Sequence, residues 1–209
     1  MIAALFVATD GPYFGLEGVD PWDVTRDARD YMGPHAVVAH PPCERWGRYW
    51  HGGPSARERK IKGDDNGCFA SALADVRQWG GVLEHPEASA AWDAYYLAKP
   101  PKSGGWVRAD ARGFTCCVEQ GHYGHRARKA TWLYAVGCTL PELAWGKSAA
   151  TARLDDGCNS IADRVARRSA GTLLKPGARL TKRERIDTPT AFRDILIAMA
   201  RSVAPEAKS

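Results

Sequence analysis

Three short apolar runs, each stopped by proline or by polar residues, constrain the fold of this chain more than any other feature. The runs lie at residues 2–8, 35–39 and 82–86, and their length and abrupt ends are typical of buried strands. Residues 68–79 place apolar side chains at helical spacing before a pair of glycines, which predicts a helix. This order predicts a βαβ unit, and therefore an α/β fold with a Rossmann-like, open and mostly parallel sheet.

The remaining sequence extends the sheet and then changes in character. Residues 114–119 and 131–136 predict two further strands, whereas residues 15–23, rich in glycine and acids, predict a loop. After about residue 146 the composition shifts to Ala, Arg and Lys. We therefore predict a Rossmann-like catalytic domain at residues 1–146 and a basic, partly helical C-terminal appendage at residues 147–209.

The last predicted helix spans residues 190–203. It carries an apolar face, made of Phe192, Ile195, Leu196 and Met199. Such a face predicts that this helix packs against the main domain.

Composition sets limits on the class of protein. The 209 residues carry 29 Lys+Arg and 24 Asp+Glu, a net charge of +5, which permits a polyanionic partner without requiring one. Hydrophobic residues make up 44% of the chain, which excludes wholesale disorder. No apolar run approaches the roughly eighteen residues that a membrane helix needs, and the six cysteines form no CxxC pair. We expect reduced thiols and a cytoplasmic location without a membrane partner; the oligomeric state is left open.

The second apolar run ends in a cluster that could carry chemistry, His40-Pro41-Pro42-Cys43. Ligands of open α/β sheets bind beyond the carboxyl ends of the strands, where this cluster is predicted to lie. Arg45, two positions further on, could lower the pKa of the Cys43 thiol and make it a nucleophile. The alternative is that Cys43 is a packed thiol.

The third run ends in Glu84-His85-Pro86. A carboxyl group at a buried strand end is expected to have a raised pKa and could exchange a proton or hold an exocyclic amine. The alternative is that Glu84 caps the next helix. If the two strands are neighbours, Cys43 and Glu84 share one crevice.

Two basic clusters follow. Residues 123–129 place Arg126, Arg128 and Lys129 close together, which suits a phosphate or a base carbonyl, although such a run is also typical of a solvated surface. In residues 179–185, Thr181 could cap a helix with Glu184 at the third position beyond it. Lys182 or Arg183 could contact a phosphate.

Taken in order, these clusters resemble the DNA cytosine-5 methyltransferase family, in a short, phage-encoded form. Pro42-Cys43 is similar to the family's Pro-Cys motif, and Glu84 and Pro86 to its Glu-Asn-Pro. Residues 123–129 are similar to its Tyr-Gly segment followed by arginines, and residues 179–184 to its Arg-x-Leu-Thr-x-x-Glu segment. The match covers roughly residues 36–137. The family's glycine-rich cofactor loop is replaced here by residues 6–15.

The resemblance implies a base-modifying enzyme that binds duplex DNA with the target base flipped out. It implies that Cys43 adds to the pyrimidine ring, that Glu84 stabilises the adduct, and that Arg128 or Lys129 braces the carbonyl or a phosphate. The residues expected to contact the substrate are Pro42, Arg45, Trp46, His85, Tyr123, His125 and Arg126. The residues expected to hold the cofactor, S-adenosylmethionine, are Phe6, Asp10, Gly11, Asp20 and Asp23. The aromatic side chains that could stack on a base are Trp46, Trp50 and Trp132.

Two alternatives stay open at this level. The altered cofactor loop favours a nucleic-acid-binding or regulatory protein that keeps the methyltransferase-like fold without catalysis. A zinc protein is the other, with ligands drawn from His40, Cys43, His122, His125 and Cys116 or Cys117. These residues lack the spacing of known zinc sites, so no metal is predicted.

Overall fold

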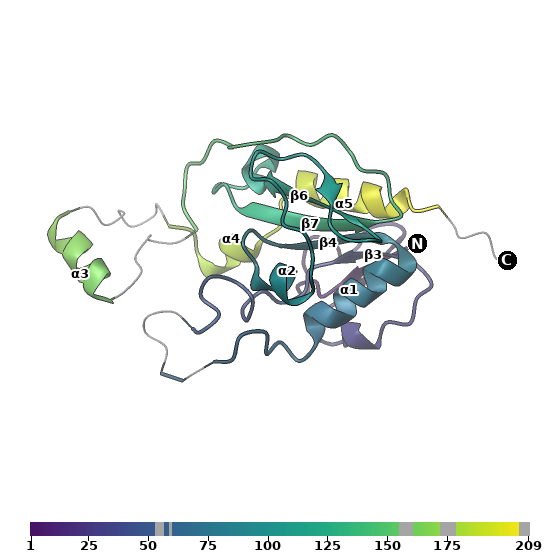
Figure 1. Ribbon diagram of the computed structural model, residues 1–209, viewed down its shortest axis with the longest axis horizontal. Helices are drawn as coiled ribbons and strands as arrows, with labels where there is room; N and C mark the ends of the chain where they lie inside the picture. The colour runs from purple at the N-terminus through teal and green to yellow at the C-terminus, as the bar shows by residue number, and fades with distance from the viewer. Residues whose placement is uncertain (53–56, 59, 155–160, 172–178, 205–209) are drawn as a thin grey trace.

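The computed structural model describes residues 1–52, 57–58, 60–154, 161–171 and 179–204. Its centre is a seven-stranded sheet with the order β2-β1-β3-β4-β7-β6-β5 (Figure 1). The strands are β1 (Ile2–Leu5), β2 (Val19–Trp22), β3 (Ala36–Ala39), β4 (Gly81–Pro86), β5 (Val107–Arg108), β6 (Phe114–Glu119) and β7 (Ala130–Val136). The helices are α1 (Cys68–Trp79), α2 (Ala90–Ala94), α3 (Ile161–Ser169), α4 (Lys182–Ile186) and α5 (Thr190–Arg201). Short 3₁₀ turns lie at Ala28–Asp30 and Gln120–Tyr123.

The sheet is mixed, with most strands parallel. β2, β1, β3 and β4 pair in parallel. β7 then pairs antiparallel with both β4 and β6, so β6 runs in the same direction as the first four strands. The predicted α/β fold with an open, mostly parallel sheet is confirmed at this level.

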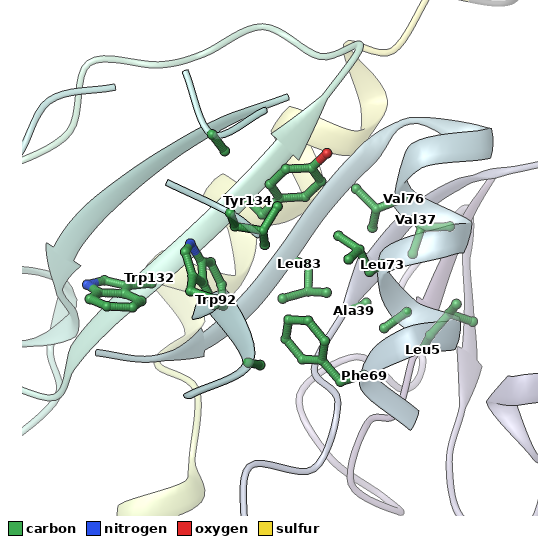
Figure 2. Packing of buried hydrophobic residues seen from close by; sticks show 14 of the residues in the cluster. Leu5, Val37, Ala39, Phe69, Leu73, Val76, Leu83, Trp92, Trp132 and Tyr134 are labelled. Atoms are coloured by element: carbon green, nitrogen blue, oxygen red, sulfur yellow. The ribbon is translucent and has the colours of Figure 1, made fainter. Parts of the chain in front are cut away.

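Helices cover both faces of the sheet. α1 contacts β3 and β4 and buries Phe69, Leu73 and Val76 against one face, as Figure 2 shows. α5 contacts β1, β3 and β4 on the other face, where Phe192 and Leu196 are fully buried. The apolar side chains of each helix therefore fill the core on their own side.

The packing of α5 bears on the predicted C-terminal appendage at residues 147–209. The helix does pack on the main domain, as its apolar face predicts, and Phe192, Leu196 and Met199 are buried while Ile195 is only partly buried. It is therefore a layer of the main domain and not part of an appendage. Of the described residues beyond 147, α3 is the segment that lies away from the sheet in Figure 1.

Local backbone conformation explains where predicted elements are too long. β1 ends at Leu5 because Phe6 adopts a left-handed conformation with φ 58°. A left-handed residue also precedes α2, which begins at Ala90 because Ala88 has φ 61° and Ser89 supplies the N-cap. The region predicted as a loop at residues 15–23 contains β2, a four-residue edge strand whose Pro21 hides its strand character.

The structure also bears on three features considered from the sequence: membrane-spanning helices, metal sites and the state of the cysteines. No helix in the described part of the chain is both long and apolar enough to cross a membrane. Within the same described ranges, no three His, Cys, Asp or Glu side chains gather as a metal site, so the proposed zinc ligands do not come together. Five cysteines are free thiols, and the sixth, Cys158, lies outside the described residues.

Candidate functional site

The candidate site lies at the edge of the sheet where the parallel strands end. From β1 the chain passes to β2 on one side and then to β3 on the other, so the strand order reverses between β1 and β3. Such a switch point opens a crevice beyond the carboxyl ends of the strands, which is where open α/β sheets bind ligands. Leu5 pairs with Ala39, and Ala39 pairs with Leu83, so His40 and Glu84 lie side by side at this edge.

Glu84 is held by donors on both carboxylate oxygens. His40 Nδ1 lies 3.0 Å from Oε2, and Gln120 Nε2 donates to Oε1 at 3.1 Å. His40 Nε2 in turn lies 2.7 Å from the hydroxyl oxygen of Tyr13. Gln120 also donates to the hydroxyl of Thr131, 3.0 Å away. Two side chains thus contact the carboxylate directly, and Tyr13 and Thr131 hold those two side chains in place.

The charge state of Glu84 differs from the expectation. Burial by itself raises the pKa of Glu84, but the hydrogen bond from His40 and the positive charge of Lys129 oppose it, and the net effect is a lowered pKa. The expected raised pKa is therefore wrong, and Glu84 is a carboxylate at neutral pH. The alternative role is also excluded, because Ser89 caps α2 by accepting a hydrogen bond from the Ala91 N–H at 3.1 Å.

Cys43 lies four residues beyond the end of β3 and is exposed to solvent. The Cys43 carbonyl accepts hydrogen bonds from the N–H groups of Trp46 and Gly47, so a tight turn fixes the loop. Desolvation by nearby protein atoms and the negative charge of Glu84 raise the pKa of the thiol, and Lys129 opposes them. The expected lowering by Arg45 is wrong, because its guanidinium points instead to the Trp50 carbonyl oxygen at 3.4 Å. Cys43 is thus a protonated thiol in the free protein.

Lys129 is the third charged member of the site. It precedes β7 with φ 44°, a left-handed conformation that costs free energy in a non-glycine residue. Its Nζ donates to the carbonyl oxygens of Asp187 at 2.5 Å and Ile186 at 3.4 Å. Burial lowers the pKa of Lys129, and the charges of Glu84 and Cys43 act on it in the opposite direction. Cys43, Glu84 and Lys129 are therefore close enough to act on one another electrostatically.

Left-handed backbone at non-glycine residues also gathers at this edge. Phe6 follows β1, Ala88 follows β4 and Lys129 precedes β7, all with positive φ. Such conformations cluster at functional sites, because the surrounding fold holds them in place.

Other predicted residues are elsewhere. Arg128 donates to the Ser148 carbonyl oxygen at 3.1 Å and lies 3.9 Å from Glu119, so no contact links it to Cys43 or Glu84. Arg126 is exposed and pairs with Glu184 at 2.7 Å. Pro42 is exposed beside Cys43.

His85 is a core residue, which contradicts its predicted role in substrate binding. It is fully buried, bonds Ser89 at 2.7 Å and packs against Phe69 and Trp92. Burial lowers its pKa to about 4. Successive residues of a strand point to opposite faces, so Glu84 and His85 cannot both face the site.

Three other residues predicted to bind the substrate are engaged in contacts within the protein. Trp46 is buried and donates from Nε1 to Asp65 at 2.7 Å. His125 is buried, and its Nε2 donates to the Glu184 carbonyl oxygen at 3.1 Å. The Tyr123 hydroxyl accepts from the Ala144 N–H at 2.9 Å. Each of these side chains thus makes a hydrogen bond that fixes a loop of the protein.

Of the three tryptophans considered for stacking, only Trp50 keeps an accessible ring. Trp46 and Trp132 are buried, whereas Trp50 is partly exposed, with Lys62 Nζ 5.6 Å from its ring centre. A cavity of about 190 Å³ lies at the same edge of the sheet, on the side of β6 and β7. It is lined by Glu87, Lys102, Cys117, Val118, Glu119, Ala130, Gly146 and Lys147.

The predicted cofactor residues surround β1 and β2, but two of the three acids are already engaged. Asp20 accepts from Trp22 Nε1 at 2.8 Å and pairs with Arg26 at 2.6 Å. Asp23 is buried and accepts from the backbone and hydroxyl of Thr25. Both carboxylates are therefore engaged within the protein, and their role in binding a cofactor stays a prediction.

The loop after β1 also differs from the cofactor loop of a dinucleotide-binding fold. A Cβ on Gly11 would lie 2.7 Å from the Ala8 carbonyl oxygen, because residues 8–11 close a hydrogen-bonded turn. No helix follows between β1 and β2, so this loop lacks the helix N-terminus that binds phosphate in dinucleotide folds. Phe6 lies at its start, and Asp10 is exposed with φ 53°.

Sequence reasoning missed two members of the site and misjudged a third. Tyr13 and Gln120 were not among the predicted site residues, and His40 was placed in the first cluster without a role other than a possible zinc ligand. A usable signal existed for Gln120, since a polar residue directly after the buried strand at 114–119 lies at the same edge as Glu84. Neither a scan against protein-family models nor a search of the curated proteins finds a match for this chain.

Proposed function

We propose that this chain is a cytoplasmic DNA base-modifying enzyme of the cytosine-5 methyltransferase type, built on a Rossmann-like domain. Cys43 adds covalently to a flipped-out pyrimidine and Glu84 stabilises the adduct. One observation carries the proposal: an exposed thiol, an ionised carboxylate and a lysine act on one another at the switch point of an open sheet.

The chemistry needs these three groups together. When the Cys43 sulfur bonds to carbon 6, the carbon 5–carbon 6 π pair shifts to carbon 4–carbon 5, and the carbon 4–nitrogen 3 pair settles on nitrogen 3. The thiol loses one proton and nitrogen 3 gains one, so the step is balanced. Carbon 5 is then an enamine carbon that can attack an electrophile.

Glu84 acts in this step as an acceptor. Each of its oxygens uses one lone pair for a protein donor and keeps another. The carboxylate can therefore accept from the exocyclic amine of cytosine and from the newly protonated nitrogen 3, which stabilises the adduct more than the free base. Lys129 supplies the positive charge that favours the Cys43 thiolate.

The test is mass spectrometry of nucleosides from the DNA of cells that express the protein, compared with cells that express Cys43→Ser. We expect a new nucleoside mass that depends on Cys43. An equal yield of that nucleoside from the Cys43→Ser variant would refute the covalent mechanism.

The engaged acids Asp20 and Asp23 favour a second candidate, a nucleic-acid-binding protein of the same fold without catalysis. The resemblance names S-adenosylmethionine as the methyl donor, and calorimetry decides between the two. Saturable binding of S-adenosylmethionine that weakens in Asp10→Ala favours the enzyme. Binding of DNA without binding of that cofactor, and without any new nucleoside, favours the second candidate.

A further inference from the structure

We propose that Tyr13 and His40 are positioning residues for Glu84: the tyrosine hydroxyl selects one tautomer of the imidazole, whose Nδ1 proton then fixes the carboxylate. The inference rests on the proposed function for its catalytic meaning. The tautomer of His40 and the ionisation of Glu84 can be measured in the free protein, without a substrate.

The three groups form one continuous hydrogen-bonded chain. Tyr13 Oη lies 2.7 Å from His40 Nε2, and His40 Nδ1 lies 3.0 Å from Glu84 Oε2. Tyr13 comes from the loop after β1, His40 follows β3 and Glu84 lies in β4. These hydrogen-bonded side chains therefore span the switch point of the sheet. Tyr13 is 2% exposed, so water does not compete for its hydroxyl.

The two hydrogen bonds that join Tyr13, His40 and Glu84 are donated in the same direction, from Tyr13 towards Glu84. Burial, followed by the charge of Glu84, raises the pKa of Tyr13, so its hydroxyl keeps its proton and donates it to Nε2. A neutral imidazole with an acceptor at Nε2 carries its proton on Nδ1. That proton faces Oε2 of Glu84, which is the arrangement that an ionised carboxylate requires.

Gln120 fixes the other oxygen. Its amide nitrogen donates to Glu84 Oε1 and Thr131 Oγ1, while its own buried Oε1 has no partner among the residues that the structure describes. Turning the amide over would place its oxygen against the carboxylate oxygen. The charge on Glu84 therefore outweighs the cost of an unpaired amide oxygen.

Other charges face this chain and enter its pH dependence. Lys129, His85 and Cys43 act on Glu84 or respond to it, and Arg193 and Asp194 of α5 act on Tyr13. Burial is the largest single influence on Glu84 and favours its protonated form. Removing the donor at position 40 should therefore raise the pKa of Glu84 into the range where it titrates during ordinary measurements.

The test uses NMR on the full chain, with the wild type beside Tyr13→Phe, His40→Phe and His40→Asn. The carboxyl carbon of Glu84 should not titrate between about pH 5 and 8 in the wild type. It should show a complete titration step in His40→Phe and no step in His40→Asn, whose amide replaces the Nδ1 donor. Nitrogen shifts should show a protonated Nδ1 in the wild type and a mixture of tautomers in Tyr13→Phe.

Two results would overturn the proposal: a Glu84 carboxyl in His40→Phe that stays ionised over this range, or an unchanged tautomer in Tyr13→Phe. If His40→Phe does not fold, the tautomer measurement in Tyr13→Phe decides alone, because that substitution removes only a hydroxyl.

A second measurement ties the chain to chemistry. We compare the rate at which each protein forms a Cys43 adduct with an oligodeoxynucleotide that carries 5-azacytosine, always relative to the wild type at the same pH, so that the ionisation of the thiol cancels. This relative rate should fall about tenfold for each pH unit below the carboxyl midpoint in His40→Phe and be restored in His40→Asn. A relative rate in His40→Phe that does not depend on pH counts against the positioning role. If no protein forms an adduct at any pH, the proposed function fails, while the NMR result still decides the tautomer.

Discussion

At the scale of single residues, the reactivity of Cys43 is set by burial, which raises the pKa of the thiol, and by two opposite charges. Glu84 raises the pKa of the thiol and Lys129 lowers it. A resting thiol at an exposed position resists oxidation, because only the thiolate is strongly nucleophilic. When a substrate donates hydrogen bonds to Glu84, the negative charge of Glu84 is partly neutralised. The repulsion between Glu84 and the developing Cys43 thiolate is then smaller.

This balance gives the first prediction. Glu84→Gln should lower the pKa of Cys43, and Glu44→Gln should lower it less, because Glu44 is the weaker of the two acidic influences. The measurement is the pH dependence of Cys43 alkylation by iodoacetamide, followed by peptide mass mapping. Equal shifts in the two variants, or an upward shift in Glu84→Gln, would show that Glu84 does not control the thiol.

At the scale of elements, α1 is anchored at its N-terminus by Asp65. The Asp65 carboxylate accepts from the N–H groups of Gly67 at 3.0 Å and Phe69 at 2.9 Å, and from Trp46 Nε1 at 2.7 Å. Asp65→Ala should lower the free energy of unfolding by about 2 kcal/mol, because it removes a helix cap and leaves a buried indole N–H unpaired. Urea denaturation measures the loss, with Asp64→Ala as the control, for which a change below about 0.5 kcal/mol is expected. Equal losses would contradict the anchoring role.

Asp75 makes the stability of the same helix depend on pH. It is buried, with Ser71 Oγ 3.4 Å away, and burial raises its pKa from 3.8 to about 6. Because the folded pKa is above the unfolded one, protonated Asp75 favours folding at low pH, and this contribution is lost as the pH rises through about 6.

Asp75→Asn should therefore be more stable than the wild type at pH 8, by on the order of 1 kcal/mol, and the difference should shrink towards pH 4. Thermal unfolding at several pH values measures it. A difference that is independent of pH would mean that Asp75 is not the titrating group.

At the scale of the whole molecule, the C-terminal helix decides whether the main domain is complete. Leu196 in α5 is fully buried against the sheet, whereas Val165 in α3 is 58% exposed. Leu196→Ala should cost about 2–5 kcal/mol of stability, and Val165→Ala less than about 0.5 kcal/mol. Chemical denaturation of both variants tests this. Similar small losses would mean that α5 is an appendage after all.

Much of the fold, and less of the site, could be predicted from the sequence. The helix at residues 68–79 and the strand at residues 114–119 match the structure at both ends, because hydrophobic periodicity and glycine stops are local signals. β2 was hidden by its proline and its position at the edge of the sheet.

The sequence did predict that Cys43 and Glu84 lie at one edge of the sheet, because each follows or ends a predicted strand and parallel neighbouring strands end at the same edge. The contacts between Tyr13 and His40 and between His40 and Glu84 join residues 27 and 44 positions apart, and no local pattern encodes them. His85 was assigned to the site although strand alternation alone turns it away from the face of Glu84.

The most direct test of the account is a trapping experiment with an oligodeoxynucleotide that carries 5-azacytosine. The ring nitrogen at position 5 makes carbon 6 more electrophilic, so an adduct can form without a group donor. We predict a protein mass increased by that of the oligonucleotide, mapped to Cys43 and lost in Cys43→Ser. Attachment at another cysteine, or no adduct while Cys43 is still alkylated by iodoacetamide, would contradict the claim that this thiol and Glu84 form a pyrimidine site.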